Sequence, residues 1–183
     1  MRKLINTLTM TAAIFMLSTA APAETYAASL VKPWTNGRLM VTANHRYLQF
    51  ENGQPFFLLG DTGWLLPERL DRSEAQYYLQ KCRAAGFNTV LVQVMNGTPA
   101  YNIYGQPSLP AGWDLTKADP DGVYSYWDHM DYIIKLAEQN GIYIGMVTIW
   151  GSQVKAGNIN ARQAKAYGSF LANRYKDSPY GIV

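Results

Sequence analysis

The sequence predicts an α/β protein organised around a parallel sheet. Three apolar runs, at residues 55–59, 87–94 and 142–150, have the composition of strands that are buried on both faces. A segment with a helix cap or helical periodicity follows each run. Because consecutive strand and helix units build a parallel sheet whose strand ends share one edge, we expect a ligand site at the carboxyl ends of the strands.

The amino terminus has the pattern of an export signal. Arg2 and Lys3 supply positive charge, residues 4–17 are largely apolar, and residues 21–23 read Ala-Pro-Ala, an A-x-A cleavage pattern. Residues 1–23 are therefore predicted to be a signal peptide, and the mature protein is expected in the periplasm or outside the cell. The apolar stretch is too short for a stable membrane helix, so no permanent membrane span is expected after cleavage.

One domain is predicted after a short linker. Residues 24–33 form the expected linker, and residues 34–183 form the expected domain. Within it, residues 38–50 mix apolar and polar positions in the manner of strands, and residues 51–54, Glu-Asn-Gly-Gln, have the composition of a turn. These features predict a small hairpin ahead of the first strand of the parallel sheet. We expect this hairpin to close the amino-terminal end of that sheet.

The first predicted helix has clear boundaries. Asp71 followed by Glu74 forms a capping box, and Gly86 stands where a left-handed cap is expected. Cys82, the single cysteine of the chain, lies on the apolar face of this helix. It is predicted to be a small core residue, and no internal disulfide is available.

A long connection follows the second strand. It spans residues 95–124 and is rich in aromatic residues, Gly and Pro. Loops of this length inside a compact domain are usually functional or disordered, and the aromatic content argues against disorder. We expect this connection to form one wall of a binding cleft. The connection contains Asn96, Tyr101, Tyr104, Trp113, Asp114, Asp119 and Asp121.

Two further helices are predicted. The second spans residues 125–140 and ends at Gly141, and the third begins near Asn160 and stops before Pro179. The expected apolar face of the second helix consists of Trp127, Met130, Ile134 and Ala137. That of the third helix consists of Ala164, Gly168, Leu171 and Tyr175.

Residues 180–183 have the composition of the start of a fourth strand. An eight-stranded α/β barrel takes about 250 residues. The chain is therefore expected to hold the first three strand and helix units of such a barrel, truncated on the C-terminal side. The alternative is a small open sheet that is complete in itself, which would leave its last strand as an unpaired edge.

The composition fits one well-buried globular domain. Hydrophobic residues make up 48% of the 183 residues and charged residues 16%, which argues against a disordered chain. The net charge of +3 is small and the basic residues are scattered, so nucleic acid is not an expected partner. Five Trp and thirteen Tyr supply rings that either pack in the core or stack against sugars.

The predicted strand ends bring together polar and aromatic residues that are far apart in the sequence. A carboxylate, two amides and two indoles around one edge are typical of a sugar site, because polar groups bind hydroxyls while aromatic faces cover the apolar side of the ring. Each residue also has a structural alternative, such as packing for the indoles or a turn-stabilising role for the carboxylate. The predicted substrate-binding residues are Asp61, Trp64, Gln93, Asn96 and Trp150.

No metal or cofactor site is predicted. The two histidines, His45 and His129, lie far apart without partners at ligand spacing, and His129 is expected on the surface of a helix. The glycines near residue 60 do not fit a phosphate-binding loop. Residues 61–63, Asp-Thr-Gly, match the aspartic protease signature. Such proteases need two of these carboxylates in an all-β fold, so a protease is the less favoured alternative.

Several segments together resemble the apiosidase-like glycoside hydrolases. The amino-terminal ones are residues 37–39, Gly-Arg-Leu, residues 44–48, Asn-His-Arg-Tyr-Leu, and residues 55–64, which contain Gly-Asp-Thr-Gly-Trp. Residues 86–94 are similar to the second strand of that family. Its second helix and third strand correspond to residues 126–133, Tyr-Trp-Asp-His-Met-Asp-Tyr-Ile, and to residues 141–151. The order and spacing of these segments cover nearly all of the mature chain.

The resemblance implies a (β/α)8 barrel that cleaves glycosidic bonds of plant cell-wall polysaccharide, in the best-known case releasing apiose from a pectic side chain. Enzymes of this type carry an acid/base carboxylate after strand four and a nucleophilic carboxylate after strand seven. The chain ends before the first of these, so no catalytic residue is assigned and these residues alone are expected to be inactive. The resemblance implies substrate contacts only for Asp61, Trp64 and Trp150.

The sequence therefore indicates two possible functions. The first is an exported glycoside hydrolase that acts on pectic oligo- or polysaccharide without a cofactor. The second is a non-catalytic carbohydrate-binding remnant of such a barrel, which kept the edge of the site and lost the carboxylates.

Overall fold

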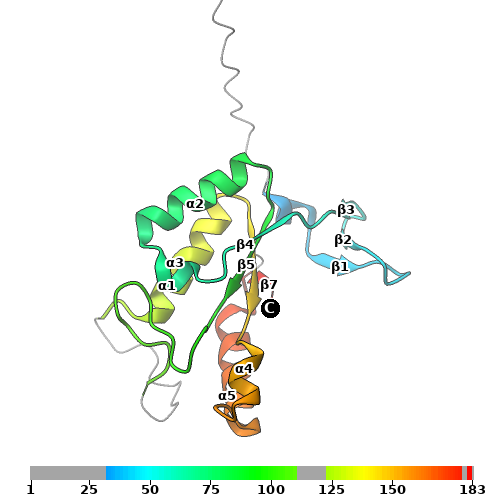
Figure 1. Cartoon of the computed structure of the whole chain (residues 1–183). Coiled ribbons are helices and arrows are strands. Elements are labelled where there is room, and N and C mark those ends of the chain that lie inside the picture. The colour runs from blue at the N-terminus through cyan, green and yellow to red at the C-terminus, as the bar shows by residue number, and fades with distance from the viewer. Residues whose placement is uncertain (1–31, 111–122, 179–180, 183) are drawn as a thin grey trace, which may run out of the picture.

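The computed structural model describes residues 32–110, 123–178 and 181–182, and these form two sheets and a layer of helices (Figure 1). The predicted signal peptide and nearly all of the predicted linker lie outside the described residues. One sheet is antiparallel in the order β1-β2-β3, and the other has the order β4-β5-β6-β7. No helix in the described ranges has the length and apolar character needed to cross a membrane.

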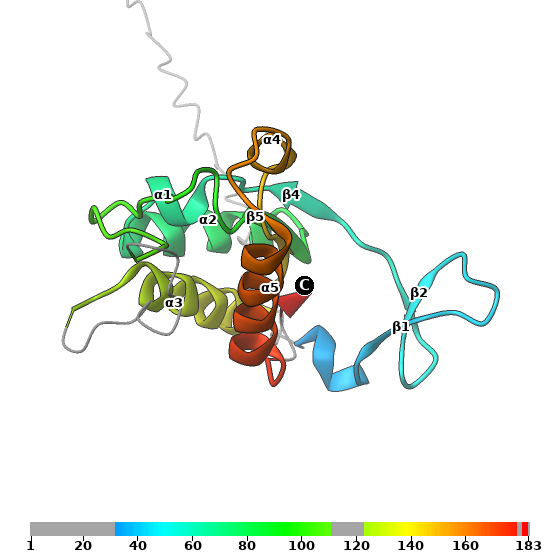
Figure 2. The same ribbon diagram turned by 90° about the horizontal axis from the view of Figure 1, so that it is seen from below.

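The small antiparallel sheet confirms the predicted hairpin and adds a strand to it. Its strands are β1 (Leu39–Val41), β2 (Leu48–Phe50) and β3 (Pro55–Phe56), and a 3-10 helix, η1 (Pro33–Asn36), precedes them. Figure 2 shows this sheet standing apart from the helices α1–α3.

The amino-terminal segment contacts the start of the larger sheet through an aromatic cluster, which agrees with the predicted position of the hairpin. The ring of Tyr143, at the start of β6, meets Trp34 and Phe56 edge to face at centroid distances of 5.5 Å each. Phe50 packs on Phe56 in the same way, at 5.4 Å. Such edge-to-face aromatic pairs add stability beyond the area that they bury. Packing within this aromatic cluster therefore joins the small sheet to the start of β6 in the larger one.

The larger sheet is parallel, and its strands are neighbours in chain order. They are β4 (Gly60–Thr62), β5 (Thr89–Gln93), β6 (Tyr143–Val147) and β7 (Gly181–Ile182). Each strand pairs in parallel with the next, and β5 with β6 is the longest pairing. The predicted parallel arrangement is therefore confirmed, including a strand at the carboxyl end of the chain.

The first strand of this sheet is shorter and later than predicted. Pro55 and Phe56 pair with β2 in the small sheet, and the next three residues are exposed, with Phe57 at 79%. The side chain of Asn88 donates to the Phe57 carbonyl at 2.7 Å and accepts from the Leu59 amide at 3.0 Å. Together with the backbone amides of Asn88 and Thr89, which donate to the Leu59 carbonyl, these bonds hold the segment ahead of β4. The prediction of a buried strand at residues 55–59 was wrong because an apolar run does not reveal which partner its backbone will find.

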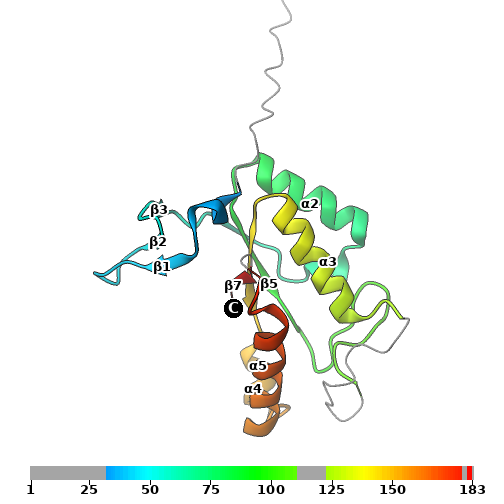
Figure 3. The same cartoon turned by 180° about the vertical axis from the view of Figure 1, so that it is seen from behind.

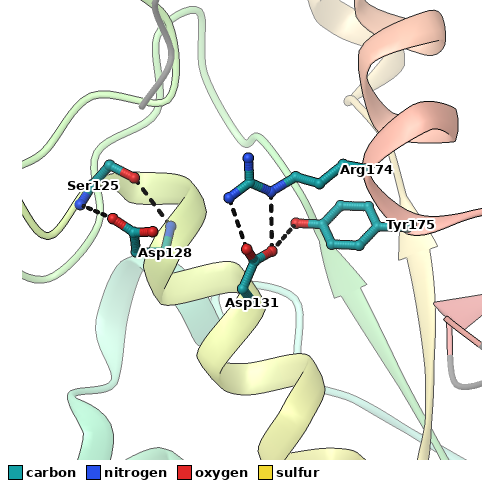
Figure 4. Close-up of polar contacts among 5 residues, drawn as sticks. All are labelled: Ser125, Asp128, Asp131, Arg174 and Tyr175. Carbon is teal, nitrogen blue, oxygen red and sulfur yellow. Dashed lines mark hydrogen bonds and ion pairs between the residues drawn. The ribbon is translucent and has the colours of Figure 1, made fainter. Parts of the chain in front are cut away.

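Five helices lie within the described residues. They are α1 (Leu66–Arg69), α2 (Arg72–Ala84), α3 (Tyr126–Gln139), α4 (Gly151–Lys155) and α5 (Ala161–Tyr175). The short helices α1 and α4 were not predicted, because one helical turn has no detectable periodicity. Capping boxes begin the three longer helices, at Asp71, Ser125 and Asn160. Figure 4 shows Ser125 and Asp128 bonding each other's backbone at the start of α3.

The main core lies between one face of the parallel sheet and the helices α2 and α3. Figures 1 and 3 show these two helices side by side, opposite the small sheet. The sheet contributes Val90, Val92 and Ile144, and the helices contribute Leu79 and Ile133, all fully buried. The predicted core role of Cys82 is confirmed, because this residue is 5% exposed in the same core.

The apolar face of α5 differs from the prediction. Ala164 and Gly168 are exposed, whereas Tyr167, Leu171 and Tyr175 are buried. Tyr167 donates its hydroxyl proton to the Thr148 carbonyl at 2.8 Å. Ala164 and Gly168 bury little apolar area, so the larger side chains of Tyr167, Leu171 and Tyr175 determine which side of the helix faces the core.

An ion pair joins α5 to α3. The Asp131 carboxylate accepts from the Arg174 guanidinium at 2.7 and 3.1 Å and from the Tyr175 hydroxyl at 2.9 Å (Figure 4). Burial, reinforced by the Asp131 charge, raises the pKa of Tyr175 far above its ordinary value, so its proton stays in this bond. Bidentate pairs of this kind specify geometry as well as adding stability.

Asp131→Ala is expected to lower the free energy of unfolding by about 1–2 kcal/mol, because it removes three charge-assisted hydrogen bonds from a site that is partly open to solvent. Asp177→Ala is the matched control, since Asp177 is an exposed aspartate just beyond the end of α5. Urea titration of both variants in the full-length protein measures the difference. Equal losses would mean that the ion pair contributes nothing.

Candidate functional site

The two faces of the parallel sheet carry different residues. Side chains alternate along a strand, so Val90 and Val92 face the helices while Thr89, Leu91 and Gln93 lie on the opposite face. The opposite face of β6 begins with the buried ring of Tyr143. Gln93 is the last residue of β5 and stands at the carboxyl end of this face, where a ligand site is expected.

Trp64, Gln93 and Trp150 come together at that end. The rings of Trp64 and Trp150 meet edge to face, with centroids 5.9 Å apart and planes at 72°. The backbone amide of Gln93 donates to the Trp64 carbonyl at 3.0 Å, which continues the pairing of β4 with β5 past the end of β4. Trp150 occupies the position just before α4 and is 48% exposed. The structure therefore brings together three of the five residues predicted for this edge.

The side chain of Gln93 is enclosed but unsatisfied. It is 3% exposed, and its Nε2 atom has no hydrogen-bond partner among the described residues. Buried side-chain amides are nearly always hydrogen-bonded, so this one is an exception that requires an explanation.

Asn96 lies just beyond β5 and contacts a residue that the sequence did not suggest. Its backbone amide donates to Glu68 Oε1, in α1, at 3.0 Å. Burial raises the pKa of Glu68, and the bond from Asn96 opposes that rise. Glu68 was missed because α1 was not predicted.

Asp61 is placed differently from the prediction. It lies within β4 rather than after the strand, opposite Val90, so its side chain faces the helices. Its carboxylate accepts from the Tyr78 hydroxyl and the Thr62 amide, at 2.8 and 2.9 Å. Cys82 Sγ lies 3.8 Å from the same carboxylate. The structure does not bring Asp61 to the group formed by the two indoles, and a substrate contact for Asp61 stays a prediction.

His129 forms a second polar cluster, and the prediction that it lies at the surface was wrong. It is fully buried, with Nε2 donating to the Leu70 carbonyl at 3.0 Å and Nδ1 2.9 Å from the Tyr124 hydroxyl. The Tyr124 hydroxyl also accepts from Arg72 Nε at 3.2 Å, so its own proton points to His129. The acidic neighbour in sequence, Asp128, suggested exposure, but Asp128 is used in the capping box.

A cavity of about 400 Å³ adjoins this cluster. Tyr104 and Tyr124 line it and meet edge to face at 5.4 Å, and the Arg72 guanidinium lies 4.1 Å from the centroid of the Tyr124 ring. Tyr104 and Tyr124 belong to the long connection, and its role as a wall of the substrate cleft stays a prediction. Of the other residues named for this connection, Tyr101 is 55% exposed, and Trp113, Asp114, Asp119 and Asp121 lie outside the described residues.

Metal ligands are not grouped in the part of the chain that the structure describes. Within residues 32–110, 123–178 and 181–182, no cluster of three or more His, Cys, Asp or Glu side chains has a geometry suited to a metal ion.

Comparison with known proteins gives consistent matches. The family model described as "Apiosidase-like, catalytic domain" matches residues 42–182. Two solved structures, a glycoside hydrolase and a glycoside hydrolase family 5 protein from Bacteroides vulgatus ATCC 8482, are each 58% identical to the chain over 81% of its length, with TM-scores of 0.80. The chain spans about a third of those structures, 34% and 32% of their lengths.

A more distant structure supports the fold alone. The endo-1,4-beta-mannanase from Rhizomucor miehei is 16% identical over 74% of the chain and 44% of its own length, with a TM-score of 0.51. None of the curated protein sequences compared with the chain matches it.

The bond between Asp61 and Tyr78 is expected to be structural. Asp61→Ala and Tyr78→Phe should each lower the free energy of unfolding by about 1 kcal/mol, and the double variant should lose less than the sum, because both changes remove the same bond. Denaturant titration of the four proteins measures the coupling. Strictly additive losses would show that the two groups do not stabilise one another and would leave the carboxylate available for another partner.

The cluster around His129 is expected to make stability depend on pH. Burial holds the pKa of His129 below its ordinary value, although the Leu70 carbonyl opposes this effect. In the unfolded chain the His129 imidazole is therefore protonated as the pH falls through about 6.5, whereas in the folded chain it is protonated only at a lower pH. The contribution of His129 to stability is complete above about pH 6.5 and is lost as the pH falls toward the lower, folded pKa.

Thermal melts between pH 5 and pH 8 test this dependence. His129→Gln should flatten the pH dependence of the melting temperature, and His45→Gln, at an exposed position, is the matched control. An unaltered slope in His129→Gln would assign the pH dependence to other groups.

Proposed function

The chain belongs to the apiosidase-like glycoside hydrolase family, and on that premise we propose that the full-length protein hydrolyses glycosidic bonds of pectic polysaccharide. A pectic substrate is the expectation for this family. Three features of the described residues support a sugar ligand. They are the position of Gln93 at the carboxyl end of a parallel strand, the paired indoles of Trp64 and Trp150, and the buried side-chain amide of Gln93.

The observation that carries this proposal is the meeting of Trp64 and Trp150. The two residues come from segments that follow different strands, and their rings lie 5.9 Å apart at one end of the sheet. Trp150 keeps 48% of its surface exposed although it is a large apolar side chain. An exposed indole beside a second indole is a surface on which the apolar face of a sugar can stack.

The sheet is proposed to be the first part of a (β/α)8 barrel. Its support is the parallel order of β4 to β7 with helices between the strands, together with relatives about three times as long as the matched segment. On this proposal β7 is the fourth barrel strand. The family places its acid/base carboxylate after that strand and its nucleophile after the seventh, so no described residue is assigned to catalysis.

The proposed chemistry follows from this arrangement. One carboxyl group protonates the departing oxygen while a second attacks the anomeric carbon or activates water, through a transition state that resembles an oxocarbenium ion. The two carboxyls must lie about 5–5.5 Å apart in a retaining enzyme and about 6.5–9.5 Å apart in an inverting one. In the described residues, Trp64, Trp150 and the amide groups would hold the sugar for that chemistry.

Export is also part of the proposal. Its support is the sequence of residues 1–23, with a positive start, an apolar stretch and an Ala-Pro-Ala site. A polysaccharide too large to enter the cell is consistent with an enzyme that works in the periplasm or outside the cell.

Two alternatives are separated by chemistry and fold. A carbohydrate-binding remnant would bind pectic oligosaccharide without releasing products, which distinguishes it from the hydrolase. The aspartic protease alternative required an all-β fold. The parallel sheet with intervening helices excludes it, because the Asp-Thr-Gly segment lies in and after β4 of that sheet.

The full-length protein is expected to release reducing sugar from pectic polysaccharide. Trp150→Ala should lower kcat/KM by about tenfold or more and lower the melting temperature only slightly, because the half-exposed ring contributes about 0.5–1.5 kcal/mol through its edge-to-face pair with Trp64. Tyr77→Ala is the control, since Tyr77 is 63% exposed on α2. Binding without product release would favour the remnant, and equal activity of both variants would remove Trp150 from the site.

A further inference from the structure

We infer that Gln93 is a specificity-determining residue of this site, which donates a hydrogen bond from its side-chain amide to a hydroxyl or ring oxygen of the bound sugar. The inference rests on the proposed function, because it takes the ligand to be a sugar. It adds the assignment of one hydrogen bond, and it explains why a buried amide is left without a partner.

The first observation is the state of the amide itself. Gln93 is 3% exposed, and its Nε2 atom makes no hydrogen bond within the described residues. An amide buried in this way destabilises the folded protein, because it has lost its hydrogen bonds to water without replacement. Exchanging the oxygen and nitrogen positions does not remove the problem, since one end of the amide would still be buried without a partner.

The second observation is the position of the residue. Gln93 ends β5 on the face turned away from the helices, and its backbone amide donates to the Trp64 carbonyl at 3.0 Å. Trp64 in turn meets Trp150 at 5.9 Å. Gln93 therefore pairs through its backbone with Trp64, at the end of the sheet where the two indoles meet and where the apolar face of a sugar would stack. Sugar rings carry oxygens around their edges, so a ring on these indoles offers the acceptor that the amide lacks.

Tyr143 provides an internal comparison. Its hydroxyl is also buried without a partner among the described residues, on the same face of the sheet. However, Tyr143 begins β6 at the opposite end, under the rings of Trp34 and Phe56. A ligand at the carboxyl ends of the strands therefore lies at the other end of the sheet from the Tyr143 hydroxyl. Lack of a partner alone therefore does not indicate a site, and it is the place of Gln93 beside the indoles that does.

Two variants of the full-length protein separate a ligand role from a structural one. Gln93→Met keeps the length of the side chain and removes the amide, and Tyr143→Phe removes only the hydroxyl. If both groups lack a protein partner, each variant should melt at the same temperature as the unaltered protein or about 2–4 °C higher in the absence of ligand.

Activity should then distinguish the two variants. The probe is pectic polysaccharide, with reducing-sugar release as the measurement. Gln93→Met is expected to lower kcat/KM by about tenfold, the loss of one hydrogen bond to substrate, while Tyr143→Phe keeps the activity of the unaltered protein.

Each other outcome has a definite meaning. A lower melting temperature for Gln93→Met would show that the amide has a protein partner and would overturn the inference. Unchanged kcat/KM in Gln93→Met would overturn it as well, and in that case the proposed function would stand. Failure of the unaltered protein to act on pectic polysaccharide would instead overturn the proposed function, and the inference with it.

Discussion

The parallel pairing of β4, β5 and β6 is the constraint on which the rest of the structure depends. Its register sets Asp61 opposite Val90 and Gln93 opposite Val147, and so decides which side chains share a face. One face packs on α2 and α3 through fully buried aliphatic residues. The other face is left for the amino-terminal cluster around Tyr143 and, at the opposite end, for the indoles. A slip of one residue in this register would exchange the two faces.

Buried polar groups on the two sides of the sheet differ in whether they have hydrogen-bond partners. Toward the helices, Asp61, His129 and Asp131 each have hydrogen-bond partners from another element. On the other face, Gln93 and Tyr143 each keep a buried polar atom without a partner among the described residues. Satisfied polar groups help to specify a unique packing, whereas unsatisfied ones destabilise it. The polar groups on the helix side therefore stabilise the fold. Those on the opposite side have unused hydrogen-bonding capacity among the described residues.

Much of the architecture could be predicted because its signals are local. Capping residues at Asp71 and Asn160 and the glycine at position 86 are read from a few neighbouring residues, and the structure confirms each of them. The site was predicted only in part. Trp64, Gln93 and Trp150 converge as expected, since strand ends of a parallel sheet must share an edge. Glu68 was missed, because its turn of helix is too short to show periodicity.

What the sequence by itself determined was the alternation of strands and helices, the helix boundaries and the family to which the chain belongs. Only the tertiary structure decided that Pro55 and Phe56 pair with β2 in the small sheet while residues 57–59 form an exposed connection. It also decided that Asp61 faces the helices and that His129 is buried. The physical reason is the same in each case. Local patterns state how polar or apolar a residue is, but the partner that satisfies its backbone or side chain comes from segments distant in the chain.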